Sequence, residues 1–191
     1  FAELGEYARS VSHLEQWLSA EPKGDPEPFA RMRDLLADQS LWDEALEAQE
    51  QYIKLLPDSG TRTDEEAVTS GLRLEKGRAL MEQGVAEARQ EALSIFAALL
   101  KADPQFVPAY LLQGRAQLAD GDIDAAVNTW TEGVAATCSL ELLNELATYH
   151  FDAGDPEQAI RSYRQSAELI EGDDGRAARL GLALLYSRLE M

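Results

Sequence analysis

The chain has 191 residues, 45% of them hydrophobic, so it is long enough to bury a substantial core. Its 35 acidic and 17 basic residues give a formal net charge of −18, which opposes nucleic-acid binding and contact with an anionic membrane surface. The longest apolar run, at 180–186, is far shorter than the roughly 20 residues of a membrane-spanning helix, so we expect this segment to make no membrane contact.

The first predicted element is a single helix within residues 1–22, which ends at Pro22. A helix pair is predicted over 26–57, where Asp25 precedes Pro26 as an N-cap precedes a proline in the first turn. Arg33 occupies a position that later pairs fill with Gly or Ala. We therefore expect this pair either to pack loosely or to turn the Arg33 side chain outward.

A second, longer helix pair is predicted over 64–104. The step from Ala45 to its counterpart Ala92 is 47 residues, about 13 more than one repeat of about 34. We divide the excess between a lengthened loop at 57–66 and an extended turn at 84–90. Both insertions are expected to lie outside the helices.

The next two pairs, 107–138 and 140–171, contain nearly the same phrase. "GDIDAAVNTWTEGVAA" begins at Gly121 and "GDPEQAIRSYRQSAEL" begins 33 residues later at Gly154. In both, Gly-Asp is followed by Ala and an aliphatic residue, and then by an aromatic residue. Small residues are needed where helix axes cross closely, so the repetition predicts that each pair packs in the same way.

Residues 174–191 predict the first helix of a further pair. The array would thus begin and end in half repeats, whose apolar faces lack a neighbouring helix. We expect the chain to be an interior fragment of a longer protein. The two ends are expected to pack against another molecule, with end-to-end self-association as one possibility.

Together these elements predict an all-α, right-handed solenoid of antiparallel helix pairs, with four full repeats between two half repeats in a single array over 1–191. The period near 34 and the pattern of small and aromatic residues resemble those of tetratricopeptide-repeat (TPR) proteins. The resemblance covers nearly the whole chain. It implies a surface for binding proteins.

No motif typical of an enzyme or of a metal or cofactor site stands out. "DGDID" at 120–124 has acids at alternate positions, but the sixth and twelfth positions of a calcium loop are Ala125 and Thr131 instead of Gly and Glu, so a repeat turn with a helix cap is favoured. His150 has no ligand partner at metal-site spacing and is expected in the core or groove. Cys138, the single cysteine, leaves the compartment undecided and is expected to be buried. We therefore predict a non-enzymatic protein without a cofactor or metal.

The concave face of such a solenoid is lined by the first helix of each pair, and we predict that a protein or peptide partner binds there. Arg78 and Arg115 hold equivalent positions and are expected to stack, either to hold an acidic group of a partner or to pair with neighbouring Glu residues. Asn144 could bond to the main chain of a bound peptide. The predicted partner-binding residues are Leu74, Arg78, Met81, Leu111, Arg115, Leu118, Asn144, Thr148 and Phe151.

Four segments carry a narrower resemblance: "LWDEALEAQEQYIKL", "LRLEKGRALMEQG", "ALLKADPQFVPAYLLQGRAQLADGDIDAAVNTWTEG" and "ARLGLALLYSRLEM". Together they are similar to the middle of the bacterial lipopolysaccharide assembly protein B family. The resemblance implies a cytoplasmic TPR array tethered to the inner membrane by a helix outside this segment. It also implies an adaptor that works with a membrane AAA protease to control lipopolysaccharide synthesis.

Two alternatives remain open at the level of sequence. The chain could be a general cell-envelope or secretion adaptor, or it could be an accessory domain of an enzyme whose catalytic part lies elsewhere.

Overall fold

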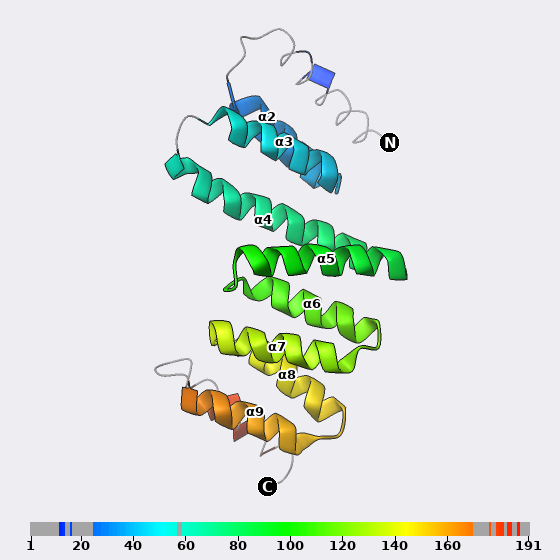
Figure 1. The fold of residues 1–191 in the computed structure, drawn as a ribbon, viewed down its shortest axis with the longest axis vertical. Coiled ribbons are helices and arrows are strands. Elements are labelled where there is room, and N and C mark those ends of the chain that lie inside the picture. The colour runs from blue at the N-terminus through cyan, green and yellow to red at the C-terminus, as the bar shows by residue number, and fades with distance from the viewer. Residues whose placement is uncertain are drawn as a thin grey trace. The chain divides into compact units, whose positions relative to one another are not determined.

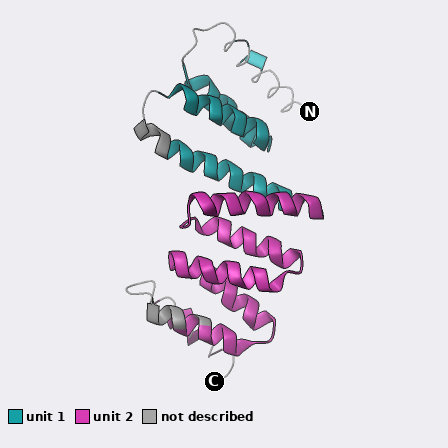
Figure 2. Cartoon of the chain, in the orientation of Figure 1, with its two compact units in different colours: residues 1–83 teal, residues 84–191 magenta. Residues whose placement is uncertain are grey.

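The computed structural model describes a nearly continuous central part of the chain and a few residues near each end: 12–13, 16, 25–56, 59–169, 176, 179–181, 183–184 and 187. Every regular element in these residues is an α-helix (Figure 1). The chain divides into two compact units, Phe1–Gln83 and Gly84–Met191 (Figure 2). Each unit is described by itself.

Unit 1 contains the helices α2 (Glu27–Asp38), α3 (Trp42–Leu55) and α4 (Ser59–Glu82). Pro26, and not Asp25 as predicted, is the N-cap residue of α2. Asp25 lies one position earlier and accepts a hydrogen bond from the Glu27 backbone N–H at 3.0 Å, so its carboxylate still satisfies a donor at the start of the helix. The α2–α3 hairpin packs on α4 through a small apolar core. The buried residues of this core are Leu36, Ala45, Ala48 and Leu72.

The predicted insertions are not loops, and here the sequence interpretation was wrong. Helix α4 begins at Ser59, so most of 57–66 is helical, and α5 begins at Ala86, which leaves only 83–85 between the two helices. The segment "TDEEA" at 63–67 contains no Gly or Pro, and such a sequence can propagate a helix at little cost. The additional residues therefore lengthen the helices instead of separating them.

One of the two expectations for Arg33 was that its side chain would turn outward. The structure contradicts this expectation. The Arg33 side chain is only 14% exposed. Its guanidinium donates to the Gln49 side-chain oxygen at 2.8 Å and lies 3.5 Å from the Glu65 carboxylate. Gln49 is fully buried and donates in turn to Glu65, at 3.1 Å to the backbone oxygen and 2.9 Å to the side chain. A polar network thus joins α2, α3 and α4 where other pairs use a small residue.

The described helices of unit 2 include α5 (Ala86–Ala102), α6 (Val107–Ala119), α7 (Ile123–Thr137), α8 (Leu140–Asp152) and α9 (Pro156–Leu169). Each helix packs against the next one along the chain (Figure 1). The bounds of α6 to α9 agree closely with the predicted pairs.

The repeated Gly-Asp phrase forms the turn within each hairpin of unit 2. Gly121 and Gly154 have φ values of 82° and 79°, a conformation that costs glycine little. The aspartate that follows each glycine caps the next helix: Asp122 accepts from Ala125 N–H at 3.1 Å and Asp155 accepts from Gln158 N–H at 3.0 Å. The same local chemistry therefore explains why the phrase occurs twice.

Gly114 shows why a small residue stands at the helix crossing. A Cβ atom added to Gly114 would overlap the indole ring of Trp130, which is 1% exposed and fills the α6–α7 interface. At Gly133 an added Cβ would lie 2.7 Å from both Leu142 and Tyr110. The close approach of α6, α7 and α8 therefore depends on the absence of side chains at these two positions.

The predicted terminal half repeats lie mostly outside the described residues. Residues 179–181 and 183–184 are helical, with Leu180 62% exposed and Leu184 59% exposed. None of the described helices is both long enough and apolar enough to cross a membrane.

Candidate functional site

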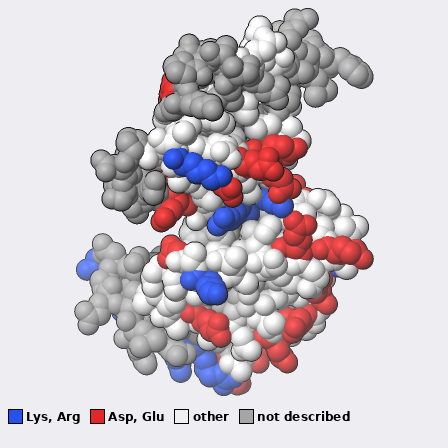
Figure 3. All heavy atoms as spheres, turned by 45° about the horizontal axis from the view of Figure 1, so that its top comes forward, with Lys and Arg blue, Asp and Glu red and all other residues white. Residues whose placement is uncertain are grey.

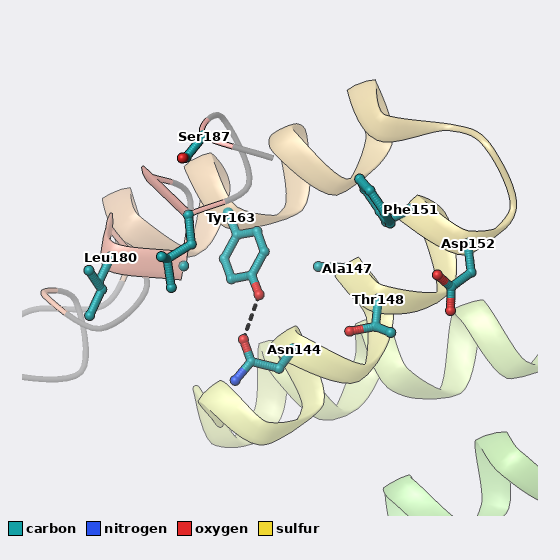
Figure 4. Close-up of a pocket in the computed structure, with 10 residues that line it drawn as sticks. Asn144, Ala147, Thr148, Phe151, Asp152, Tyr163, Leu180 and Ser187 are labelled. Atoms are coloured by element: carbon teal, nitrogen blue, oxygen red, sulfur yellow. Dashed lines mark hydrogen bonds between the residues drawn. The ribbon is translucent and has the colours of Figure 1, made fainter. Parts of the chain in front are cut away.

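A cavity of about 560 Å³ opens beside α8 and α9 in unit 2 (Figure 4). Three residues of the predicted partner-binding set, Asn144, Thr148 and Phe151, all come from one face of α8 and line it. The other lining residues are Ala147, Asp152, Tyr163, Leu180, Gly181, Leu184 and Ser187. We call this space the α8 cavity.

A hydrogen bond across the cavity fixes the orientation of Asn144. The Tyr163 hydroxyl donates to the Asn144 side-chain oxygen at 2.6 Å (Figure 4). Burial raises the pKa of Tyr163 above its usual value of 10.0, so the phenol stays protonated as a donor at neutral pH. Since the Asn144 oxygen is occupied, its amide group retains two N–H donors for another molecule.

Apolar side chains form the rest of the wall. Phe151 is half-buried, and Leu180 lies across the cavity from it (Figure 4). Gly181 lets this wall approach α9, because an added Cβ there would lie 2.5 Å from the Tyr163 ring. Asp152 supplies the one charged side chain in the described lining and makes no hydrogen bond or ion pair with any described residue. The cavity thus combines apolar contact, amide donors and a carboxylate.

The three predicted residues of α6 are placed differently. Leu111 is buried in the core with Trp130, and Leu118 packs against that core from a half-buried position. Arg115 donates two hydrogen bonds to Glu145 of α8, from Nε at 2.6 Å and from Nη2 at 2.8 Å. This pairing raises the pKa of Arg115 above its usual value.

The three predicted residues of α4 lie in unit 1. Leu74 is buried, Met81 is half-buried, and Arg78 is exposed with its guanidinium 3.7 Å from the Glu75 carboxylate. Both arginines therefore pair with a Glu, as the second interpretation of these residues predicted. Their stacking stays a prediction, since they belong to separate units.

Two of the three acids in the turn at 120–124 are engaged within the protein. Asp120 accepts from Arg89 at 2.5 Å and from Gln90 at 2.9 Å, while Asp122 caps α7. Asp120 and Asp122 therefore have structural roles, in a turn and in a helix cap. Among the described residues no group of three or more His, Cys, Asp or Glu is arranged to hold a metal ion.

Cys138 is exposed, which contradicts the expectation that it would be buried. It ends α7 with φ 54°, in the left-handed conformation that terminates a helix, and this places it in the turn to α8 instead of in the core.

Charged side chains occur at many places on the face of the molecule drawn in Figure 3. On the face drawn in Figure 3, acidic side chains occur at several separate places with a smaller number of basic ones among them. The excess negative charge is therefore not confined to one patch of this face.

Sequence reasoning missed the part that Tyr163, Leu180 and Leu184 play in the α8 cavity. Tyr163 is the aromatic residue of the second Gly-Asp phrase and holds the place that Trp130 has in the first. A phenol at that position, in place of an indole, was the available signal, since its hydroxyl can reach across to α8. The two leucines belong to the half repeat predicted at 174–191, whose apolar face was expected to lack a neighbouring helix.

Helix hairpins that recur every 33 or so residues and pack through small residues define a helical-repeat protein. No protein-family model matches the chain, and no curated protein matches it in sequence. Solved structures do match.

Three of these structures are of TPR or MamA proteins. MamA 41-end from Desulfovibrio magneticus RS-1 is 21% identical, with 88% of each chain covered and a TM-score of 0.51. The C-terminal part of a TPR repeat-containing protein from Cytophaga hutchinsonii is 17% identical, covers 98% of this chain and 68% of that chain, and has a TM-score of 0.54. A tetratricopeptide repeat protein from Parabacteroides merdae is 16% identical, covers 84% of this chain and 59% of that chain, and has a TM-score of 0.52. The helices that the structure describes have the fold of a TPR solenoid.

Proposed function

We propose that this protein is a non-enzymatic scaffold that binds a segment of another protein in the α8 cavity. The observation that carries the proposal is the convergence of Asn144, Thr148 and Phe151 with Tyr163 around one space of about 560 Å³. That volume lies within the range of roughly 300–1,000 Å³ typical of pockets that hold small ligands or anchoring side chains.

The arrangement suits a peptide better than a reacting substrate. The two free N–H groups of Asn144 can donate to a main-chain carbonyl, while an apolar side chain of the partner fills the space between Phe151 and Leu180. The helices that carry these groups are already formed in the free protein. Because binding does not have to order them, the entropic cost of binding is lower.

Site-specific photocrosslinking tests the proposal. A photoreactive amino acid at Thr148, which is exposed and lines the cavity, is expected to crosslink a partner in cells. The matched control places it at Ala135, which is exposed on α7 and does not line the cavity. Capture of the same protein from both positions, or from neither, would count against a binding site at the cavity.

We further propose that the biological role is that of a cytoplasmic regulator of lipopolysaccharide synthesis that acts with a membrane AAA protease. Its support is the resemblance of 41–55, 72–84, 98–133 and 178–191 to lipopolysaccharide assembly protein B. The resemblance implies that the protease, helped by the adaptor, controls the deacetylase that commits sugar precursors to lipid A, so deletion of the gene should raise the level of this deacetylase. An unchanged level would favour the general envelope or secretion adaptor.

A further inference from the structure

A second groove lies on the opposite side of α8, between the first half of α7 and the last residues of α8. Successive helix residues are about 100° apart, so Thr148 and Phe151 face the α8 cavity while Tyr149, His150 and Ala153 face away from it. The groove is lined by Ile123, Asp124, Val127, Asn128, Tyr149, His150, Ala153 and Asp155. We call it the α7–α8 groove.

The floor of this groove is apolar and partly uncovered. Ile123 is 48% exposed although it is a large aliphatic residue, and Val127 and Tyr149 beside it are only half-buried. The Tyr149 ring lies near two other rings. Its centroid is 6.1 Å from the centroid of the Trp130 ring and 5.5 Å from the centroid of the His150 ring. The groove therefore offers a fixed aromatic and aliphatic surface to an apolar side chain.

The rim carries negative charge and free hydrogen-bonding groups. Asp124 and Asp155 are the charged lining residues at neutral pH, and no Lys or Arg stands among the lining residues. Asp124 and Asn128 lie one turn apart on α7, and neither makes a hydrogen bond or ion pair with a described residue. Asp155 also caps α9, so Asp124 is the carboxylate that is fully available to another molecule.

We propose that the α7–α8 groove is a second docking site, which takes a peptide segment that presents an aliphatic side chain beside a lysine or arginine. The aliphatic side chain would cover Ile123, Val127 and Tyr149. The cation would lie against Asp124, and Asn128 could bond the main chain. The carboxylates of Asp124 and Asp155 would repel an acidic segment, so the groove should prefer a basic segment to an acidic one.

The site is independent of the α8 cavity, so the two can be tested separately. The probe is a short amphipathic peptide of leucine and lysine, and its control is the same peptide with glutamate in place of lysine. Titration at physiological ionic strength is followed in the ¹⁵N–¹H spectrum of the labelled protein. We expect the lysine peptide to shift the amides of Ile123, Val127, Asn128 and His150, and the glutamate peptide to leave them in place.

Variants then measure the contribution of each group. Asp124→Asn should weaken lysine-peptide binding about two- to fivefold, as expected for an exposed ion pair. Ile123→Ala should weaken it about five- to tenfold through lost apolar contact. Both residues are exposed, so the fold should persist, which circular dichroism checks. Glu141→Gln, which changes an exposed acid in the first turn of α8 that lines neither the groove nor the α8 cavity, should leave the affinity unchanged.

Three results would overturn the proposal. The first is a set of shifts centred on Asn144 and Thr148, which would assign the peptide to the α8 cavity. The second is equal binding of the glutamate peptide. The third is an affinity that Asp124→Asn and Ile123→Ala both leave unchanged.

Discussion

Arg115 and Glu145 are joined by two parallel hydrogen bonds, of 2.6 and 2.8 Å, which link α6 to α8 across two successive repeats. The guanidinium fork matches the carboxylate at both oxygens, the geometry in which an arginine pair is most specific. Because the Arg115 side chain is 51% exposed and that of Glu145 is 27% exposed, solvent screens much of the attraction.

A double-mutant cycle with Arg115→Ala and Glu145→Ala should therefore give a coupling energy of only about 0.5–1 kcal/mol in the free energy of unfolding. The coupling should fall as salt is added. The control cycle on Arg161 and Glu157, which are 3.9 Å apart and more exposed, should give less. Equal couplings for the two pairs would show that the bidentate geometry adds nothing.

Gly114→Ala should destabilise unit 2 by about 1–3 kcal/mol, because the new methyl group overlaps the Trp130 ring in a packed core. Gly71→Ala is the matched control: Gly71 also lies within a helix, and nothing stands within 4 Å of its added Cβ. That change should be neutral or stabilising by up to about 1 kcal/mol. Urea denaturation followed by tryptophan fluorescence measures both, and a stable Gly114→Ala variant would contradict the crossing geometry.

Arg33→Leu should destabilise unit 1 by about 1–3 kcal/mol, because it leaves the buried Gln49 oxygen without its donor and Glu65 without its cation. Arg31→Leu serves as the control, since Arg31 is 70% exposed and pairs only with Glu27 one turn away. Chemical denaturation should separate the two variants clearly. If both lost the same small amount, the polar network would have no special role in stability.

Protonation of His150 should lower stability in weakly acidic solution. Burial is the main cause that lowers the pKa of His150 below 6.5; Arg161 lowers it further, and Asp155 opposes both. The unfolded chain therefore binds the proton more readily, and the free energy of unfolding falls as pH drops from about 6.5 through the folded pKa. His150→Gln should flatten this part of the stability curve. NMR titration of the ring protons that placed the His150 pKa above 6.5 would reverse the sign.

The parts of this structure that follow from sequence are those decided by neighbours in the chain. The Gly-Asp turns and the small residue at the helix crossing beside Trp130 are local features that recur with the period, and both are found. The second helix pair was predicted to begin at residue 64, whereas α4 begins at Ser59. The length of an insertion alone does not distinguish a loop from a longer helix. The pairs Arg33–Gln49 and Tyr163–Asn144 join residues 16 and 19 positions apart on different helices, so they depend on side-chain reach that no spacing rule encodes.

The most direct test of the scaffold is to fill its cavity. Thr148→Trp places an indole in the α8 cavity from an exposed position, and Ala135→Trp adds the same side chain to an exposed position on α7. The affinity of each variant for the segment captured by crosslinking would be measured by calorimetry. If the segment binds in the α8 cavity, Thr148→Trp should lower its affinity at least about tenfold, or about 1.4 kcal/mol, and Ala135→Trp should leave the affinity unchanged. Unchanged affinity in a folded Thr148→Trp variant would contradict binding in the cavity.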